Sequence, residues 1–124
     1  MKFVIYGVGA IGGVLAAKLA LSGAEVVGIA RGPQLDAIRK RGLLLRTPDG
    51  EETVRFGAAS DPGEIKFDAD DVVILAMKTQ DTPVALQRLR AASVVGQPIV
   101  CAQNGVTNER FALRRFPNVY AMTV

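Results

Sequence analysis

The sequence predicts an α/β fold that is Rossmann-like, with a mostly parallel sheet and helices on both faces. Short apolar runs alternate with segments of helical spacing along the 124 residues. This is the pattern of strand–helix–strand units, which build parallel sheets. The first unit also encloses the glycine-rich turn Gly7–Gly12, between a buried strand and a helix. That position is typical of a turn that binds a dinucleotide.

The first thirty residues contain one complete unit. A continuous apolar run over residues 2–7 indicates a strand buried on both faces. Small and apolar residues at helical spacing follow from Ile11, and Gly23 marks the expected end of that helix. Residues 25–30 form the second apolar run. We therefore expect two parallel strands joined by a right-handed helical crossover.

The remaining elements are predicted from apolar runs, from prolines in first helical turns and from turn residues. The last apolar run has nothing after it to cover a sheet edge. We therefore expect residues 1–124 to be a dinucleotide-binding domain that is truncated at its C-terminal end. In chain order the expected elements are a helix over 33–41, a hairpin over 43–56 around the turn TPDG, a loop over 58–70, a strand over 71–77, a helix over 82–92, a strand over 98–102, a helix over 107–116 and a strand from Asn118.

Composition excludes several classes of function. The chain has no histidine, which removes Ser-His-Asp and Cys-His catalysis and argues against a metal site. Its single cysteine, Cys101, cannot form an internal disulfide, so a cytoplasmic location fits. The net charge of +3 is spread over short basic groups with few aromatic residues, which does not suit a nucleic-acid surface. Polar residues interrupt the apolar stretch over 11–30, so we expect no membrane span.

The glycine turn matches the pattern GxGxxG. It follows a predicted strand and opens a predicted helix within a strand–helix–strand unit, which is the context in which this pattern indicates a dinucleotide site. The first glycine permits a tight turn, the second lets the backbone approach a pyrophosphate, and the third lets the helix pack closely on the strand. Unpaired N–H groups at the helix start favour a phosphate. The alternative is a close-packed turn without a ligand. We assign cofactor binding to the whole turn, that is, to Gly7, Val8, Gly9, Ala10, Ile11 and Gly12.

Arg31 follows the second predicted strand, 19 residues after Gly12. An acid that holds the ribose 2′-hydroxyl of NAD is expected about 20 residues after the turn. No acid follows this strand: Glu25 is at its other end and Asp36 lies within the next predicted helix. Arginine can bind a 2′-phosphate through two charge-assisted hydrogen bonds. Arg31 therefore predicts NADP rather than NAD, and the alternative is a surface arginine at a strand end.

Two more polar residues follow predicted strands. Lys78 comes after the strand over 71–77, and Asn104 follows the strand over 98–102. The carboxyl ends of parallel strands share one edge of the sheet, where ligands bind. We therefore expect Lys78 and Asn104 to lie near the cofactor. Ordinary solvation of a strand end is the alternative for Lys78, and a plain Asn-Gly turn is the alternative for Asn104.

The ordered set GVGAIGG, AR, the PDG hairpin turn, AMKTQDT and QNGV resembles the ketopantoate reductase family, that is, 2-dehydropantoate 2-reductases. The resemblance extends from Lys2 to Val124. It implies an NADPH-dependent oxidoreductase of pantothenate biosynthesis that acts on a small 2-keto acid. It also implies that Arg31 binds near the 2′-phosphate, and that Lys78 and Asn104 contact both cofactor and substrate.

The resemblance further implies a helical second domain that supplies the catalytic lysine, which we expect beyond Val124. We therefore assign no catalytic residue within this chain, and we expect this part alone to be inactive. The family often has glutamine three residues after the lysine. Here Asp81 occupies that position and Gln80 comes one residue early, so we assign no contact to Gln80.

Other readings stay open. The chain is also compatible with another NADP-dependent 2-keto acid or opine-type dehydrogenase, because substrate choice depends on the expected second domain. A dinucleotide-sensing module without catalysis is an alternative of a different class. An open edge strand could also pair with a second copy and produce a dimer.

Overall fold

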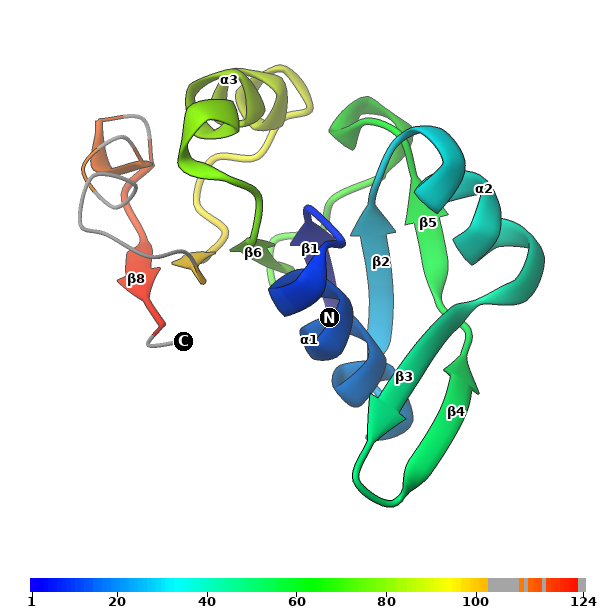
Figure 1. The fold of residues 1–124 in the computed structure, drawn as a ribbon. Helices are drawn as coiled ribbons and strands as arrows, with labels where there is room; N and C mark the ends of the chain where they lie inside the picture. Colours follow the sequence, from blue (N-terminus) through cyan, green and yellow to red (C-terminus); the bar gives the residue numbers. More distant parts are fainter. Residues whose placement is uncertain (103–109, 111, 115, 123–124) are drawn as a thin grey trace.

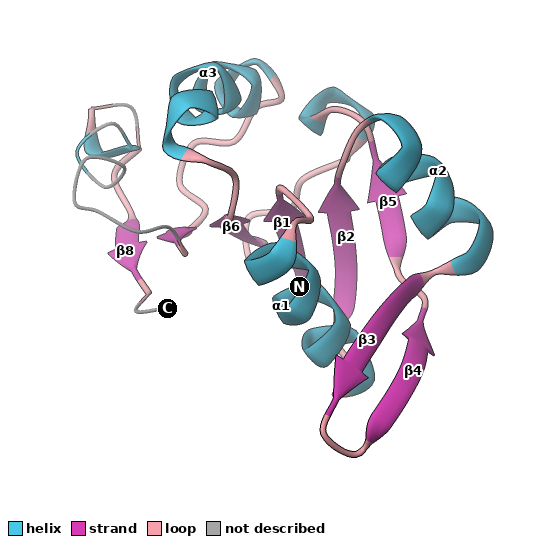
Figure 2. Cartoon of the chain, viewed as in Figure 1, coloured by secondary structure: helices cyan, strands magenta, loops and turns pink. Residues whose placement is uncertain are grey.

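The computed structural model describes residues 1–102, 110, 112–114 and 116–122. In this part of the chain, six parallel strands form one sheet in the order β5-β2-β1-β6-β7-β8 (Figures 1 and 2). The predicted parallel α/β fold is confirmed. The strands of this sheet are β1 (Lys2–Tyr6), β2 (Glu25–Ile29), β5 (Gly57–Ala59), β6 (Val72–Leu75), β7 (Ile99–Cys101) and β8 (Val119–Ala121).

Helices cover both faces of the sheet. Neighbouring residues of a strand point to opposite faces, so apolar residues in succession need a covering layer on each side. Val4 of β1 packs in one core with Leu86, and Ile5 packs in another with Ala16. Leu86 and Ala16 belong to different helices, which therefore lie on opposite faces. The helices are α1 (Ala10–Leu21), α2 (Gly32–Arg41) and α3 (Thr82–Ala91), with short 3₁₀ turns η1 (Pro62–Glu64) and η2 (Thr79–Asp81).

The predicted hairpin forms a separate antiparallel sheet from β3 (Leu43–Thr47) and β4 (Gly50–Val54). Its inner residues Leu45 and Val54 are buried against Ala17 of α1. The hairpin therefore extends the apolar layer on the α1 face without joining the main sheet (Figure 1).

The structure differs from the prediction over residues 58–70. This segment begins with β5, which pairs in parallel with β2, instead of being a loop from its start. The three residues Gly57–Ala59 have no β-branched or aromatic side chain, so their strand character comes from pairing with β2 and not from local preference. Five of the ten residues of the helix predicted over 107–116, namely 107–109, 111 and 115, lie outside the described residues.

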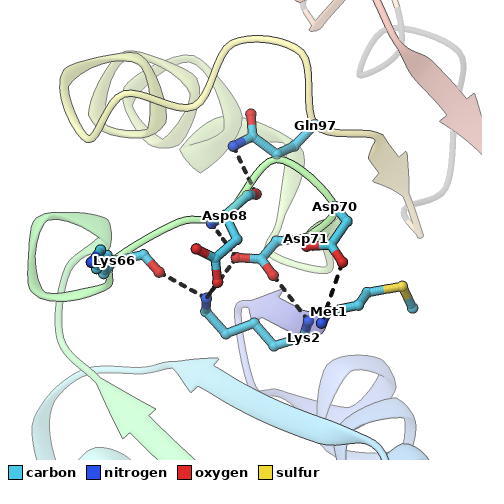
Figure 3. A network of polar contacts seen from close by, with 7 residues as sticks. All are labelled: Met1, Lys2, Lys66, Asp68, Asp70, Asp71 and Gln97. Atoms are coloured by element: carbon cyan, nitrogen blue, oxygen red, sulfur yellow. Dashed lines mark hydrogen bonds and ion pairs between the residues drawn. The ribbon is translucent and has the colours of Figure 1, made fainter.

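A buried polar network joins the amino ends of β1 and β6 (Figure 3). The Asp71 carboxylate accepts from the Lys2 backbone N–H at 2.9 Å and from the Asp68 backbone N–H at 2.7 Å. The Lys2 ammonium also donates to the Lys66 carbonyl at 2.7 Å. Asp71 thereby fixes the segment before β6 against the first residue of β1.

Candidate functional site

A cleft of about 640 Å³ opens at the carboxyl ends of β1, β2 and β6, between the glycine turn and the segment that leads into α3. Gly7, Val8, Gly9, Arg31 and Lys78 all line it. The structure thus brings these predicted residues together from three strand ends. A smaller hollow of about 420 Å³ lies at the amino ends of the strands, away from all of them.

The three glycines of the turn have different environments. Gly7 has φ +100°, and a Cβ atom there would lie 2.7 Å from the Met77 backbone nitrogen. A Cβ atom on Gly12 would overlap the Gly7 carbonyl oxygen. A Cβ atom on Gly9 would meet no heavy atom within 4 Å. Gly7 and Gly12 are therefore required by packing, whereas Gly9 leaves open space in the cleft.

The turn leads directly into the amino terminus of α1. Gly9 precedes the helix and has no side chain with which to cap it, and the first turn contains no acidic residue. The first backbone bond of the helix runs from the Gly13 N–H to the Gly9 carbonyl at 2.7 Å. The earlier N–H groups, those of Ala10 and Ile11, belong to the part of a helix that lacks intrahelical acceptors. This end of the helix favours an anion.

Helix α2 supports the same turn. The Gln34 side-chain amide donates to the Val8 carbonyl oxygen, and Val8 is buried in a core with Leu35 and Ile38 of α2. The glycine turn is therefore held from both sides, by α1 behind it and by α2 beside it.

Arg31 lies at the carboxyl end of β2, at the position before the first residue of α2. Its side chain is 87% exposed, and its guanidinium lies 3.8 Å from the Asp81 carboxylate. Sequence reasoning found no acid near this strand end. The structure corrects this, because Asp81 reaches it from η2, the turn after β6.

Lys78 follows β6 and is exposed at the start of η2, where its backbone carbonyl accepts from the Asp81 N–H at 2.9 Å. Gln80, to which we assigned no contact, also lines the cleft. Ala10, Ile11 and Gly12 lie behind the turn in α1. Asn104, the other predicted residue, lies outside the described residues.

Sequence reasoning missed a polar group at the base of the cleft. Tyr6 ends β1, half-buried, and Arg88 of α3 lies beside it and pairs with Asp61 at 3.2 Å. Burial raises the pKa of Tyr6, and the neighbouring Arg88 guanidinium partly offsets that rise. Tyr6 belongs to an apolar run and Arg88 to a helix surface, so no motif marked either residue.

Charge in the cleft is predominantly positive. Among the described residues that line it, the cations are Arg31, Lys78 and Arg88, and the acid is Asp81. The described residues contain no group of three or more His, Cys, Asp or Glu side chains placed to hold a metal ion. The same part of the chain contains no helix long and apolar enough to cross a membrane. The arrangement suits an elongated anionic ligand with one phosphate at the glycine turn.

Comparison with known proteins gives one consistent family. The family model described as ketopantoate reductase PanE/ApbA matches residues 3–124. The chain is 42% identical to the 2-dehydropantoate 2-reductase of Mesorhizobium japonicum, over 86% of this chain and 32% of that protein. It is 36% identical to the 2-dehydropantoate 2-reductase of Aquifex aeolicus, over 87% of this chain and 33% of that protein. The chain therefore spans about a third of the length of these curated relatives.

Solved structures agree with the sequence comparison. A PanE/ApbA family ketopantoate reductase from Ralstonia eutropha superposes with a TM-score of 0.86 at 31% identity, over 98% of this chain and 40% of that chain. A D-mandelate dehydrogenase in a ternary structure with NADH and anilino(oxo)acetate superposes with a TM-score of 0.84 at 25% identity. That match also covers 98% of this chain and 40% of the other.

Proposed function

Because the chain belongs to the ketopantoate reductase PanE/ApbA family, we propose that it is the NADPH-binding domain of a 2-dehydropantoate 2-reductase. The whole protein then transfers a hydride from NADPH to the ketone carbon of 2-dehydropantoate and forms pantoate. The observation that carries this proposal is the cleft itself, which gathers the glycine turn, Arg31 and Lys78 at one edge of the sheet.

The glycine turn fits a dinucleotide pyrophosphate. The open space at Gly9 lets a phosphate approach the backbone, and the N–H groups at the start of α1 are available as donors. Arg31 then binds the 2′-phosphate of the adenosine ribose, because its exposed guanidinium can form two charge-assisted hydrogen bonds. These roles support NADPH as the preferred dinucleotide.

Lys78 is proposed to contact the cofactor and the 2-keto acid from the end of β6, together with Asn104. An ammonium at this edge can bind a substrate carboxylate or stabilise the negative charge that develops on the ketone oxygen. Bound NADPH supplies the hydride chemistry. This chain's own residues bind and orient the reactants, and we assign the general acid to none of them.

A second substrate class is also worth testing, because the D-mandelate dehydrogenase superposes almost as well as the ketopantoate reductase. That protein was solved with NADH and anilino(oxo)acetate. A panel of 2-keto acids assayed with the full-length protein separates the two: preference for 2-dehydropantoate supports the main proposal, and preference for an aromatic 2-keto acid supports the second.

Calorimetric titration of this chain with NADPH and NADH tests the cofactor assignment. NADPH is expected to bind more tightly, and Arg31→Ala is expected to abolish the difference. Arg46→Ala is the matched control, because Arg46 is also an exposed arginine near one acid, Glu51, at 3.5 Å. Equal binding of both dinucleotides by the unmodified chain would refute the 2′-phosphate role of Arg31. A melting curve of each variant establishes that it is folded.

A further inference from the structure

Asp81 is the one acidic residue among the described residues that line the cleft. Its carboxylate lies 3.8 Å from the guanidinium of Arg31, the group proposed to bind the 2′-phosphate. The two residues come from different strand ends, Arg31 after β2 and Asp81 from η2 after β6. The Asp81 carboxylate thus already lies beside the Arg31 guanidinium, which a 2′-phosphate would need as its binding partner.

We infer that Asp81 determines the cofactor preference of this cleft by competing with a 2′-phosphate for Arg31. The inference rests on the proposed function, because it assumes that a dinucleotide binds here with its adenosine ribose near Arg31. A 2′-phosphate brings further negative charge to within a few ångströms of the Asp81 carboxylate, and like charges at that distance repel. Asp81 therefore weakens NADPH binding.

NADH meets the opposite situation. Its ribose carries a 2′-hydroxyl, which can donate a hydrogen bond to a carboxylate, as in NAD-dependent sites. Asp81 can supply that acceptor, although it belongs to η2 after β6 and not to the segment that follows β2. The pair of Arg31 and Asp81 thus serves both dinucleotides, and the cleft discriminates between them less strongly than Arg31 alone would.

Asp81 precedes the first residue of α3, where the helix dipole favours an acid, but its side chain is not fixed to the helix. Its side chain is 43% exposed, and its carboxylate forms no capping hydrogen bond with α3. The backbone N–H of Asp81 forms the η2 hydrogen bond with Lys78, and that bond does not depend on the side chain. Replacement of the carboxylate by an amide therefore leaves the turn and the helix intact.

The test compares Asp81→Asn with the unmodified chain by titration with NADPH and with NADH. The ratio of the NADH dissociation constant to the NADPH dissociation constant is expected to rise about fivefold at low ionic strength, and less at high salt, where charge repulsion is screened. Asp49→Asn is the matched control, because Asp49 is an exposed acid in the hairpin turn and does not line the cleft. This control is expected to leave the ratio unchanged.

Three results have different meanings. An unchanged or lower ratio in Asp81→Asn overturns the inference and leaves the proposed function standing. A folded unmodified chain that binds neither dinucleotide overturns both. A ratio that rises equally in Asp49→Asn also overturns the inference, because general charge then explains it. Asp81→Ser gives an independent second variant, with serine equally suited to the start of a helix, and melting curves confirm that each variant is folded.

Discussion

The Lys2 ammonium lies 2.6 Å from an Asp71 carboxylate oxygen, and the two side chains are only 10% and 0% exposed. Burial alone would raise the pKa of Asp71, but hydrogen bonds from the Asp68 N–H and from Lys2 outweigh it, so the pKa is lowered. Burial alone would lower the pKa of Lys2, but the nearby carboxylates, Asp71 first and then Asp68 and Glu25, together outweigh burial, so the pKa is raised. Both groups therefore stay charged inside the fold.

Removal of one partner of this pair is expected to destabilise the chain strongly. Asp71→Ala removes the buried counter-charge of the Lys2 ammonium and leaves it only the exposed Asp68 carboxylate, 3.6 Å away, which costs about 3–5 kcal/mol. Asp70→Ala is the control, because Asp70 is 68% exposed and faces the amino terminus at 3.5 Å. Such exposed pairs contribute about 0–1 kcal/mol. Urea unfolding measures the free energy of unfolding of both variants. Equal decreases would show that the Lys2–Asp71 pair stabilises the fold no more than an exposed pair does.

The lowered pKa of Asp71 also predicts the response to acid. A carboxyl whose pKa is lower in the folded state stabilises the fold above its ordinary pKa of 3.8, and this contribution is lost as the pH falls through the folded value. The raised pKa of Lys2 acts at alkaline pH. Its contribution to the free energy of unfolding is present below the ordinary lysine pKa of 10.5 and is lost as the pH rises through the folded value.

The measurement is the free energy of unfolding from about pH 7 down to about pH 2. The unmodified chain is expected to lose stability below the ordinary aspartate pKa. Asp71→Asn starts from a lower stability and should show a shallower acid decline, because it lacks the titrating group. A parallel decline in both proteins would show that other carboxylates carry the acid response.

Alanine substitutions of Gly9 and Gly12, at the start of α1, are expected to affect different properties: cofactor affinity for Gly9 and stability for Gly12. Gly9→Ala places a methyl group in open space, so the melting temperature should stay nearly unchanged while NADPH affinity falls at least about tenfold, since the phosphate loses its approach to the backbone. Gly12→Ala places the methyl group on the Gly7 carbonyl oxygen, so the fold itself should be destabilised. Calorimetry and thermal melting separate the two. A destabilised Gly9→Ala would contradict the assignment.

Tyr6 predicts a late phenol titration. Burial holds its pKa above the ordinary 10.0, with a partial offset from Arg88, so the neutral phenol is favoured and stability is lost as the pH rises further. The chain has two tyrosines, so phenolate absorbance against pH should contain a late component. Tyr6→Phe should remove that component, and Tyr120→Phe should leave it in place. Retention of the late component in Tyr6→Phe would show that Tyr6 is not its source.

The sequence predicted best what local signals determine. The run from Lys2, the glycine turn and the helix end at Gly23 lie close together along the chain, and each has its own residue signature. The hairpin was equally local, because TPDG marks its turn. Gly57–Ala59 was missed because its strand depends on pairing with β2, a contact that no local pattern contains.

The residues that line the cleft likewise fall into those that local sequence signals predicted and those that they did not. Gly7, Arg31 and Lys78 were identified because each follows a strand, and parallel strands end at one edge. Asp81 and Arg88 belong to a turn and a helix surface, where an acid or an arginine is ordinary. Their places near Arg31 and Tyr6 follow from the order of the strands, in which β1 lies between β2 and β6.

The hairpin of β3 and β4 pairs only with itself within the described sheet topology and rests on α1 through Leu45 and Val54. Its turn lies at the end of the molecule opposite the arrowhead of β2 (Figure 1). The cleft opens at that carboxyl end of β2. Residues 47–50 are therefore a suitable attachment point for a dye or a surface tether. Immobilisation through this turn would present the cleft outward, and additional residues there would leave the register of the six parallel strands unchanged.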